Sequence, residues 1–245
     1  MNCFVLIPNG SYKLSPVKRV YSPKGNGKSR PLGIKTLEDR MIQQAINQCL
    51  QQYFQPLFSE HCYGFRPGKS VHDAVKMTRS SYIAEGKTWV VDIDLASFFD
   101  EVNHDILMRR VCEVIRDKRV LHLIGTYLFS GVAEDGLVTK GYKGVPQGGT
   151  LSPLLSNIYL DAVDKEFEKR GLSFCRYPDD CNIYVKSSAA AQRVFKSVCT
   201  WIEKHLKIAV NRDKSAWGEP WEPLFLGYRH RRNGNLVPSP KAIQR

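Results

Sequence analysis

Apolar residues recur along this chain with two different periods, and each change of period marks a predicted element. A spacing of three and four residues is typical of a helix that packs on one side. Two such runs follow Thr36 and Ser70. In each, the residue three positions on is an aspartate (Asp39, Asp73), which completes an N-capping signal. Further helices are predicted after Asn103, after Pro153 and over residues 121–129 and 189–206.

Short apolar runs between the helices predict strands. Residues 88–94 (TWVVDID) have the pattern of a buried strand, and two apolar runs flank the Asp179-Asp180 pair. A small hairpin is predicted within 131–146, and other short strands at 17–21, 208–210, 223–228 and 236–237. Because strands and helices do not alternate regularly, this order predicts an α+β fold with helices behind one face of an antiparallel sheet.

The chain carries an excess of basic residues. Its 245 residues include 36 Lys and Arg against 24 Asp and Glu, which gives a net charge of +12 and a pI near 9.4. Such an excess suits a polyanionic partner such as nucleic acid, through neutralisation of phosphates and release of their counterions. A basic protein with another function fits the charge equally well, so charge alone decides nothing.

Cysteine spacing and hydropathy exclude some classes of protein. The seven cysteines stand singly and form no CxxC pair, which argues against a zinc site. No apolar stretch reaches the length of a signal sequence or of a membrane span. We therefore expect a cytoplasmic protein with no membrane partner.

Two segments carry carboxylates in positions that suit metal binding. Asp92 and Asp94 share one face of the 88–94 strand, and burying both without compensation would be costly. Asp179 and Asp180 stand together at a tight turn, where turn chemistry accounts for only one of them. A solvated strand end or an ordinary turn explains each segment alone. Together they predict a site for hard divalent cations, which prefer carboxylate oxygens.

Two glycine-containing segments need separate interpretation. Residues 144–153 (GVPQGGTLSP) open a predicted helix, and their glycines allow close approach of the backbone to a ligand. Alone, this segment could be a plain loop. Residues 25–29 (GNGKS) resemble the end of a P-loop, but the required first glycine would fall at Ser22. They are better interpreted as a turn between two strands.

The acidic strand, the 144–153 segment and the Asp pair occur in an order and spacing that resemble motifs A, B and C of reverse transcriptases. Four further stretches make the chain similar to the group II intron-encoded members of that family. They are 30–34 (RPLGI), 59–68 (SEHCYGFRPG), 154–160 (LLSNIYL) and 225–228 (FLGY). The resemblance extends from about Ser15 to Tyr228.

The resemblance implies the fingers and palm of a right-hand polymerase, with an antiparallel palm sheet backed by helices and without a thumb. The fingers would span 1–86, with 105–145 as inserted helices and a hairpin. The palm would comprise 87–104 and 146–235, and 236–245 would begin the connection to a thumb. The implied activity is RNA-directed DNA polymerisation, in which deoxynucleotides are added to a primer 3′-hydroxyl on an RNA template.

The resemblance also assigns site roles. Asp94, Asp179 and Asp180 would be catalytic and hold two Mg²⁺ ions, with Mn²⁺ as a substitute, and Asp92 would lie behind them. The residues implied in nucleotide binding are Lys24, Arg30, Phe99, Gln147 and Lys214. Those implied in primer or template binding are Lys18, Arg66, Gly148, Phe225, Leu226, Gly227 and Tyr228. The implied partners are an RNA template, intron RNA, a DNA or RNA primer and deoxynucleoside triphosphates, and a homodimer stays open.

Two features depart from the family. The residue before the Asp pair is usually alanine in these enzymes, whereas here it is Pro178, whose ring fixes φ at about −65°. A turn that needs a strained corner residue with positive φ would exclude proline and shift the metal ligands. The chain is also shorter than members that carry a thumb, so we expect a fragment or a truncated reading frame. The main alternative is therefore a weak or inactive polymerase that acts as an RNA-binding splicing (maturase) cofactor. Use of the core in a retron or in phage defence is a third.

Overall fold

The computed structural model describes residues 14–23, 29–134, 137–139, 141–221, 225–230 and 236–238. The chain divides into two compact units. The first is made of Met1–Phe58 and Ser97–Tyr159, and the second of Ser59–Ala96 and Leu160–Arg245. The ranges predicted for fingers and palm divide the chain at other residues, and they stay predictions.

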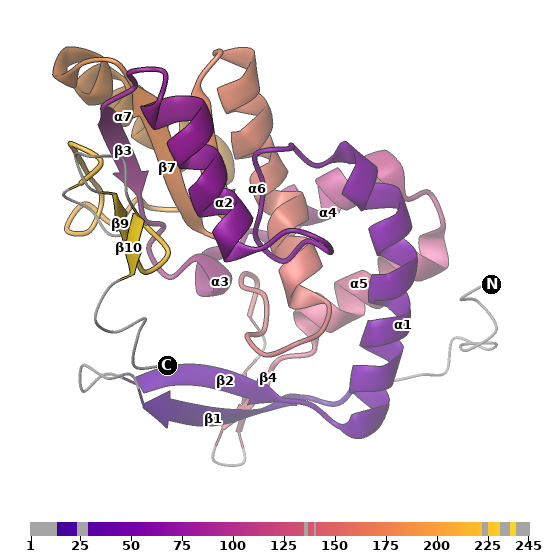
Figure 1. Ribbon diagram of the computed structural model, residues 1–245. Coiled ribbons are helices and arrows are strands. Elements are labelled where there is room, and N and C mark those ends of the chain that lie inside the picture. The colour runs from indigo at the N-terminus through magenta and orange to yellow at the C-terminus, as the bar shows by residue number, and fades with distance from the viewer. Residues whose placement is uncertain are drawn as a thin grey trace. The chain divides into compact units, whose positions relative to one another are not determined.

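The first unit combines a four-stranded sheet with helices (Figure 1). Its strands lie in the order β2-β1-β4-β5, with β1 antiparallel to β2 and parallel to β4. The strands are β1 (Val17–Pro23), β2 (Ser29–Ile34), β4 (Val132–Glu134) and β5 (Leu137–Thr139). The helical elements are α1 (Leu37–Phe54), η2 (Gln55–Leu57), α3 (Phe98–Glu101), α4 (His104–Val114), α5 (Lys118–Phe129) and the start of α6 (Ser152–Lys169).

Side-chain caps fix where the helices begin. The caps predicted at Thr36, Ser70 and Asn103 are present, each accepting a hydrogen bond from a backbone N–H of the first turn. A fourth cap, Asp117, was not predicted, and because of it α5 begins at Lys118 rather than at 121. Apolar spacing misses this start because the first turn of α5 is largely polar and exposed.

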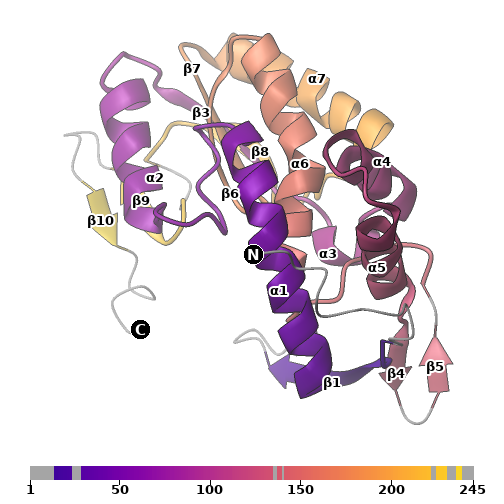
Figure 2. The ribbon, with the colours of Figure 1, turned by 90° about the vertical axis from the view of Figure 1, so that its right-hand side faces the viewer.

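The second unit is built on an antiparallel sheet with the strand order β6-β7-β3-β8. Helix α2 lies on one face of this sheet and helix α7 on the other (Figure 2). The strands are β3 (Trp89–Ile93), β6 (Ser173–Tyr177), β7 (Asp180–Val185) and β8 (Ala216–Gly218). The other elements are α2 (Val71–Met77), its π-helical continuation η3 (Thr78–Ile83), α7 (Ser188–Leu206) and the β9 (Tyr228–His230) and β10 (Leu236–Pro238) pair.

These elements confirm the predicted α+β class, with an antiparallel sheet covered by helices. Two predicted strands were wrong, and one strand was missed. Of the strand predicted at 223–228, residues 225–228 form a turn and β9 begins only at Tyr228, while 223–224 lie outside the described residues. Strand β8 was missed because three residues at an exposed edge are too few to show a period. The strand predicted at 208–210 reduces to one bridge between Leu95 and Val210. Among the described helices, none combines the length and the apolar character needed to span a lipid bilayer.

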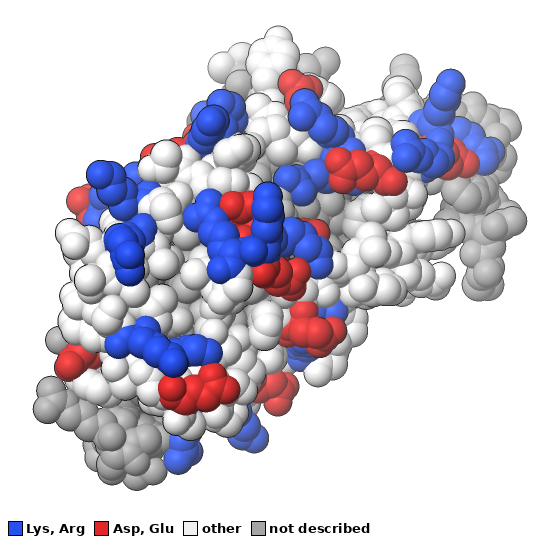
Figure 3. All heavy atoms as spheres, turned by 90° about the horizontal axis from the view of Figure 1, so that it is seen from above, with Lys and Arg blue, Asp and Glu red and all other residues white. Residues whose placement is uncertain are grey.

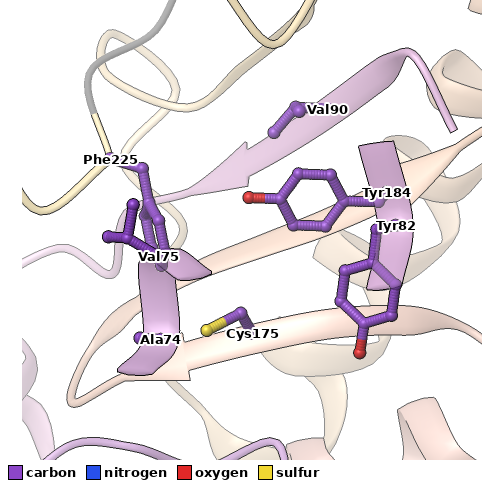
Figure 4. Packing of buried hydrophobic residues seen from close by; sticks show 7 residues of the cluster. All are labelled: Ala74, Val75, Tyr82, Val90, Cys175, Tyr184 and Phe225. Atoms are coloured by element: carbon purple, nitrogen blue, oxygen red, sulfur yellow. The ribbon is translucent and has the colours of Figure 1, made fainter. Parts of the chain in front are cut away.

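An apolar cluster anchors one face of the second sheet (Figure 4). Val90, Cys175 and Tyr184 lie on three neighbouring strands and point to the same side, since alternate residues of a strand share a face. They pack with Ala74, Val75, Tyr82 and Phe225, and all seven side chains are buried. Asp92 lies two residues beyond Val90 on the same face. The packing of Val90 in this cluster therefore holds β3 in place, and the same strand carries Asp92 and leads into Asp94.

Candidate functional site

The pairing of β3 with β7 brings the predicted carboxylates to one edge of the second sheet. The register places Asp92 opposite Asn182 and Ile93 opposite Cys181, so Asp94 comes next to Asp180 as β3 ends and β7 begins. Asp179 precedes Asp180 in the turn between β6 and β7. All three carboxylates therefore belong to a single compact unit, although 84 residues or more separate Asp94 from the other two in sequence.

The backbone of Asp94 is fixed by a segment that follows helix α7. Its N–H donates to the Ser215 hydroxyl at 2.8 Å, and its carbonyl accepts from the Asn211 N–H at 2.9 Å. The Asp94 side chain remains 27% exposed and lies 3.3 Å from the Lys214 ammonium, measured from Oδ2 to Nζ. Because these backbone hydrogen bonds hold Asp94 in place, its carboxylate is not needed to fix the residue and stays accessible to a ligand.

Pro178 lies in a two-residue turn whose backbone is compatible with proline. Tyr177 pairs with Asp180, so Pro178 and Asp179 form a two-residue loop, and none of the four has a positive φ. The first loop position of a turn favours proline, whose ring already has the required φ. The preceding residue is extended, as proline demands. The shift of the metal ligands expected from proline stays a prediction, because this geometry does not compare the turn with one that carries alanine.

We expect Pro178→Ala to leave catalysis nearly unchanged. Alanine takes the same negative φ, and its greater freedom in the unfolded state should lower stability by about 1 kcal/mol at most. Single-turnover primer extension and thermal unfolding measure the two effects. A rate gain of about tenfold or more, equivalent to about 1.4 kcal/mol in the barrier, would show instead that proline displaces the ligands.

Two carboxyl groups near this turn have raised pKa values, which favours either their protonation or the binding of a cation. Burial, together with Asp180 and Asp94, raises the pKa of Asp92 to about 7. Desolvation of the carboxyl group and the charges of Asp179 and Asp94 raise the pKa of Asp180 to about 6, although the residue as a whole is exposed. With its amide oriented to donate, Asn182 contacts Asp92 Oδ1 at 3.0 Å. Like charges close together disfavour ionisation, and a bound cation reverses that preference.

The donor set fits a hard divalent ion. Asp94, Asp179 and Asp180 offer carboxylate oxygens only, which Mg²⁺ and Mn²⁺ prefer over nitrogen or sulfur. Within the described part of the chain, no three acidic, histidine or cysteine side chains already converge as closely as a metal cluster requires.

In the first unit, the glycine-containing segment 144–153 is held by backbone contacts on both sides. The Val145 N–H donates to the Phe99 carbonyl at 2.6 Å, and the Gly33 N–H donates to the Gln147 carbonyl at 2.8 Å. Gly148 has φ of 91°, a conformation that glycine takes without strain. A cavity of about 350 Å³ opens here, and Phe99, Gln147 and Gly33 are among its lining residues. The Phe99 and Gln147 predicted to bind nucleotide thus line one cavity.

A buried polar network, which the sequence did not predict, supports this segment. The Lys35 ammonium donates to Gln43 Oε1 at 2.9 Å and to the Tyr127 hydroxyl at 2.8 Å. That hydroxyl lies 2.7 Å from Ser152 Oγ, and Ser152 donates to the Pro146 carbonyl at 2.6 Å. The chain of contacts ends one residue before Gln147. The feature of the sequence that could have indicated this network is a lysine directly after an apolar strand.

We expect Lys35→Met to change how stability depends on pH. Burial lowers the pKa of Lys35 to about 7, with Asp39 opposing the shift. Between pH 7 and the unfolded-state value, the folded chain then binds fewer protons than the unfolded chain, so this lysine makes stability rise with pH. Urea unfolding at several pH values should show that rise in the wild type and a smaller rise in the variant. Parallel curves would contradict the assignment.

The segment predicted to contact primer forms a tight hairpin turn. Phe225 and Tyr228 exchange two backbone hydrogen bonds of 2.9 Å, while Leu226 and Gly227 both have positive φ. Two positive φ values define the turn type that matches the twist of paired strands. The Tyr228 hydroxyl lies 2.9 Å from His72 Nε2, so helix α2 supports the hairpin.

The other basic residues predicted to bind nucleotide, primer or template have different environments. Lys18 is exposed on β1, and the backbone of Arg30 pairs with Ser22 on the same sheet. Arg66 donates to the carbonyls of Ser59 at 2.6 Å and Cys62 at 3.3 Å, so part of its guanidinium braces its own loop. Lys24 lies outside the described residues.

Basic side chains on the face shown in Figure 3 are interspersed with acidic ones rather than gathered into one patch. Partly exposed ion pairs among the described residues include Arg170–Glu166 and Lys143–Glu101, both at 2.7 Å. Such pairs contribute about 1 kcal/mol or less, so their basic partners can exchange a carboxylate for a phosphate at little cost.

Comparison with known proteins decides the family. The model of the family described as "Reverse transcriptase (RNA-dependent DNA polymerase)" matches residues 22–230. The chain belongs to the reverse transcriptase family. Reverse transcriptase domains generally use divalent metal ions, which agrees with the carboxylate chemistry of the second unit.

Relatives of this reverse transcriptase include intron-encoded proteins. It is 34% identical to protein YkfC of Escherichia coli over 90% of the chain and 68% of that protein. It is 39% identical to the group II intron-encoded protein LtrA of Lactococcus lactis, over 65% of the chain but only 26% of LtrA. The resemblance to group II intron proteins is therefore confirmed, while the chain spans about a quarter of LtrA.

Solved structures confirm the fold of the reverse transcriptase. Apo telomerase from Candida tropicalis, truncated from its C-terminal domain, superposes with a TM-score of 0.71 at 13% identity. The match covers 94% of this chain and 56% of the telomerase chain. Telomerase from Candida albicans, solved with a fragment of telomeric RNA, gives a TM-score of 0.66 over 93% of the chain and 47% of the telomerase.

Proposed function

We propose that the chain is an RNA-directed DNA polymerase whose reaction centre is formed by Asp94, Asp179 and Asp180. The observation that carries this proposal is the antiparallel register of β3 and β7, which presents all three carboxylates at one sheet edge. Desolvation and the neighbouring carboxylates raise the pKa of Asp180, and Lys214 only partly offsets them, so a bound cation would stabilise its charged form. A templated polymerase needs such an edge to hold divalent cations beside the primer terminus.

The residues at this edge of the sheet would have distinct roles in nucleotide addition. Asp94 and Asp179 would hold Mg²⁺ with Asp180 completing the set, and Mn²⁺ would substitute. Bound ions would supply Lewis-acid stabilisation of the attacking 3′-oxygen and of the leaving pyrophosphate. The Lys214 side chain is 67% exposed beside Asp94 and would neutralise phosphate charge.

Family resemblance assigns substrate selection to residues of the first unit. Phe99 would exclude a ribose 2′-hydroxyl, and Gln147 would contact the incoming nucleotide and the template. Arg30, Lys24 and Lys18 would neutralise phosphates of the triphosphate or of the strand. The two backbone hydrogen bonds that hold the 144–153 segment support this assignment, because a fixed loop presents its side chains at little entropic cost.

An RNA-binding splicing cofactor is the second candidate function. The observation that favours it is the 39% identity with a group II intron-encoded protein, together with a net charge of +12. Intron RNA would then be the partner, and binding would fall steeply with salt because phosphate contacts dominate. The two functions are compatible in one chain.

One assay separates these candidates. The chain is incubated with Mg²⁺, deoxynucleoside triphosphates and a labelled primer annealed to an RNA template, and binding of the same duplex is followed by fluorescence anisotropy. Templated extension of the primer supports the polymerase. Salt-sensitive binding without any extension would contradict it and leave the cofactor function.

A further inference from the structure

A buried arginine lies directly behind the turn that carries the acid pair. Arg176 is the fourth residue of β6, and its side chain is 1% exposed, among the most completely buried in the described residues. It points to the side of the sheet opposite the apolar cluster, since its neighbour Cys175 belongs to that cluster. A charged side chain at this depth requires partners in fixed geometry.

The guanidinium joins three separate parts of the unit. Its Nε and one terminal nitrogen donate to the two carboxylate oxygens of Asp164 on helix α6, the first at 2.7 Å. The same terminal nitrogen lies 3.0 Å from the Cys62 sulfur, and the other donates to the Pro178 carbonyl at 2.7 Å. The Arg176 backbone also pairs with His61 and Tyr63, which adds a short stretch to the edge of β6.

The position of the Pro178 carbonyl determines how the Asp179 side chain is oriented. It belongs to the planar peptide that links Pro178 to Asp179, so fixing the oxygen fixes the plane from which the Asp179 side chain departs. The bond is charge-assisted and therefore short and directional. Asp164 is fully buried and holds the guanidinium at two points, so the donor cannot follow the turn if the turn moves.

Stability alone gives little reason for this arrangement. A buried ion pair gains about as much from attraction as it loses in desolvation, and apolar residues of similar volume often serve as well or better. What an apolar pair cannot do is donate a hydrogen bond to the turn. The specific contribution of the Arg176–Asp164 pair is therefore orientation of the Pro178–Asp179 peptide.

We propose that Arg176, locked by Asp164, is a positioning residue that sets the Asp179–Asp180 turn for metal binding and nucleotide addition. This inference rests on the proposed function of the carboxylates. It differs from it in assigning a role to residues that touch neither substrate nor metal.

The test uses a double variant that removes the tether without leaving a buried charge. Arg176→Met with Asp164→Leu replaces the pair by apolar side chains, so the chain should still fold, with duplex affinity unchanged. We expect the single-turnover rate at saturating nucleotide to fall about a hundredfold, as for a misplacement of about 1 Å. The nucleotide KM should change little. Mn²⁺ affinity, measured by electron paramagnetic resonance, should fall in parallel. Wild-type rate and Mn²⁺ affinity in this variant would overturn the proposal.

A second variant covers the case in which the double variant does not fold. Arg176→Lys keeps the charge opposite Asp164 but lacks the planar fork that also reaches Pro178, so the same losses of rate and Mn²⁺ affinity are expected. Full activity in a folded Arg176→Lys chain would overturn the proposal. If the wild type extends no primer, the polymerase function fails, and the change in Mn²⁺ affinity still decides the role of Arg176. A wild type that binds no Mn²⁺ overturns both.

Discussion

Replacing Asp94 with asparagine should lower the rate of templated nucleotide addition by at least about a thousandfold, equivalent to about 4 kcal/mol in the barrier. The amide matches the carboxylate in size but removes the negative charge that would hold a divalent ion. The fold should survive, because Asp94 is fixed by its own backbone through Ser215 and Asn211. Single-turnover extension on an RNA template measures the rate, and anisotropy measures retained duplex binding.

Asp213 provides a matched control for this substitution. It is an exposed carboxylate in the same segment, and its N–H contacts Asn211. Asp213→Asn therefore removes one negative charge from the same part of the unit without touching the proposed ligands. We expect it to retain the wild-type rate. Extension that persists in Asp94→Asn, or that is lost equally in Asp213→Asn, would contradict the assignment of Asp94.

The second large effect is expected for Gly64→Ala. A methyl group at this position would lie 2.5 Å from Cα and 2.7 Å from N of Pro178. Both are backbone atoms that no rotamer change can move aside. The turn would have to shift by about 1 Å, which should lower the extension rate about a hundredfold. The melting temperature should also fall, because the segment around Tyr63 pairs with β6.

Gly125→Ala is the control for that change. Gly125 lies within helix α5, and a methyl group there would meet no other atom within 4 Å. Alanine in a helix interior is preferred over glycine by up to about 1 kcal/mol, so this variant should be slightly more stable and fully active. A Gly64→Ala chain that extends primer as fast as Gly125→Ala would show that the turn tolerates displacement.

Local features of the fold were predictable from sequence because their causes are local. Helix α1 follows from a cap at Thr36 and an apolar spacing, and β3 from a short apolar run that only Asp92 interrupts. The acid pair could be placed at a turn because its flanking strands were evident. The resemblance to the family's motif, in which an aromatic residue follows the metal ligand by five positions, favoured Asp94 over Asp92, and this assignment stays a prediction.

The supports of the site were not predictable, since each joins residues far apart in the chain. Lys35 meets Tyr127 across 92 positions, and Arg176 meets Cys62 across 114. The spacing of apolar residues along the chain does not predict such long-range pairs. The available signal was a basic residue within an apolar run or directly after one, and such a residue does not show which partner it contacts.

The central claim is that Asp94 and the Asp179–Asp180 turn hold one divalent-metal site, and metal-directed cleavage of the chain tests it directly. Fe²⁺ bound in place of Mg²⁺ generates hydroxyl radicals with ascorbate and peroxide, and these cut the nearest backbone. The account predicts cuts beside Asp94 and within 178–181 that excess Mg²⁺ suppresses and that Asp94→Asn abolishes. Cuts confined to other segments, or unchanged by that substitution, would contradict it.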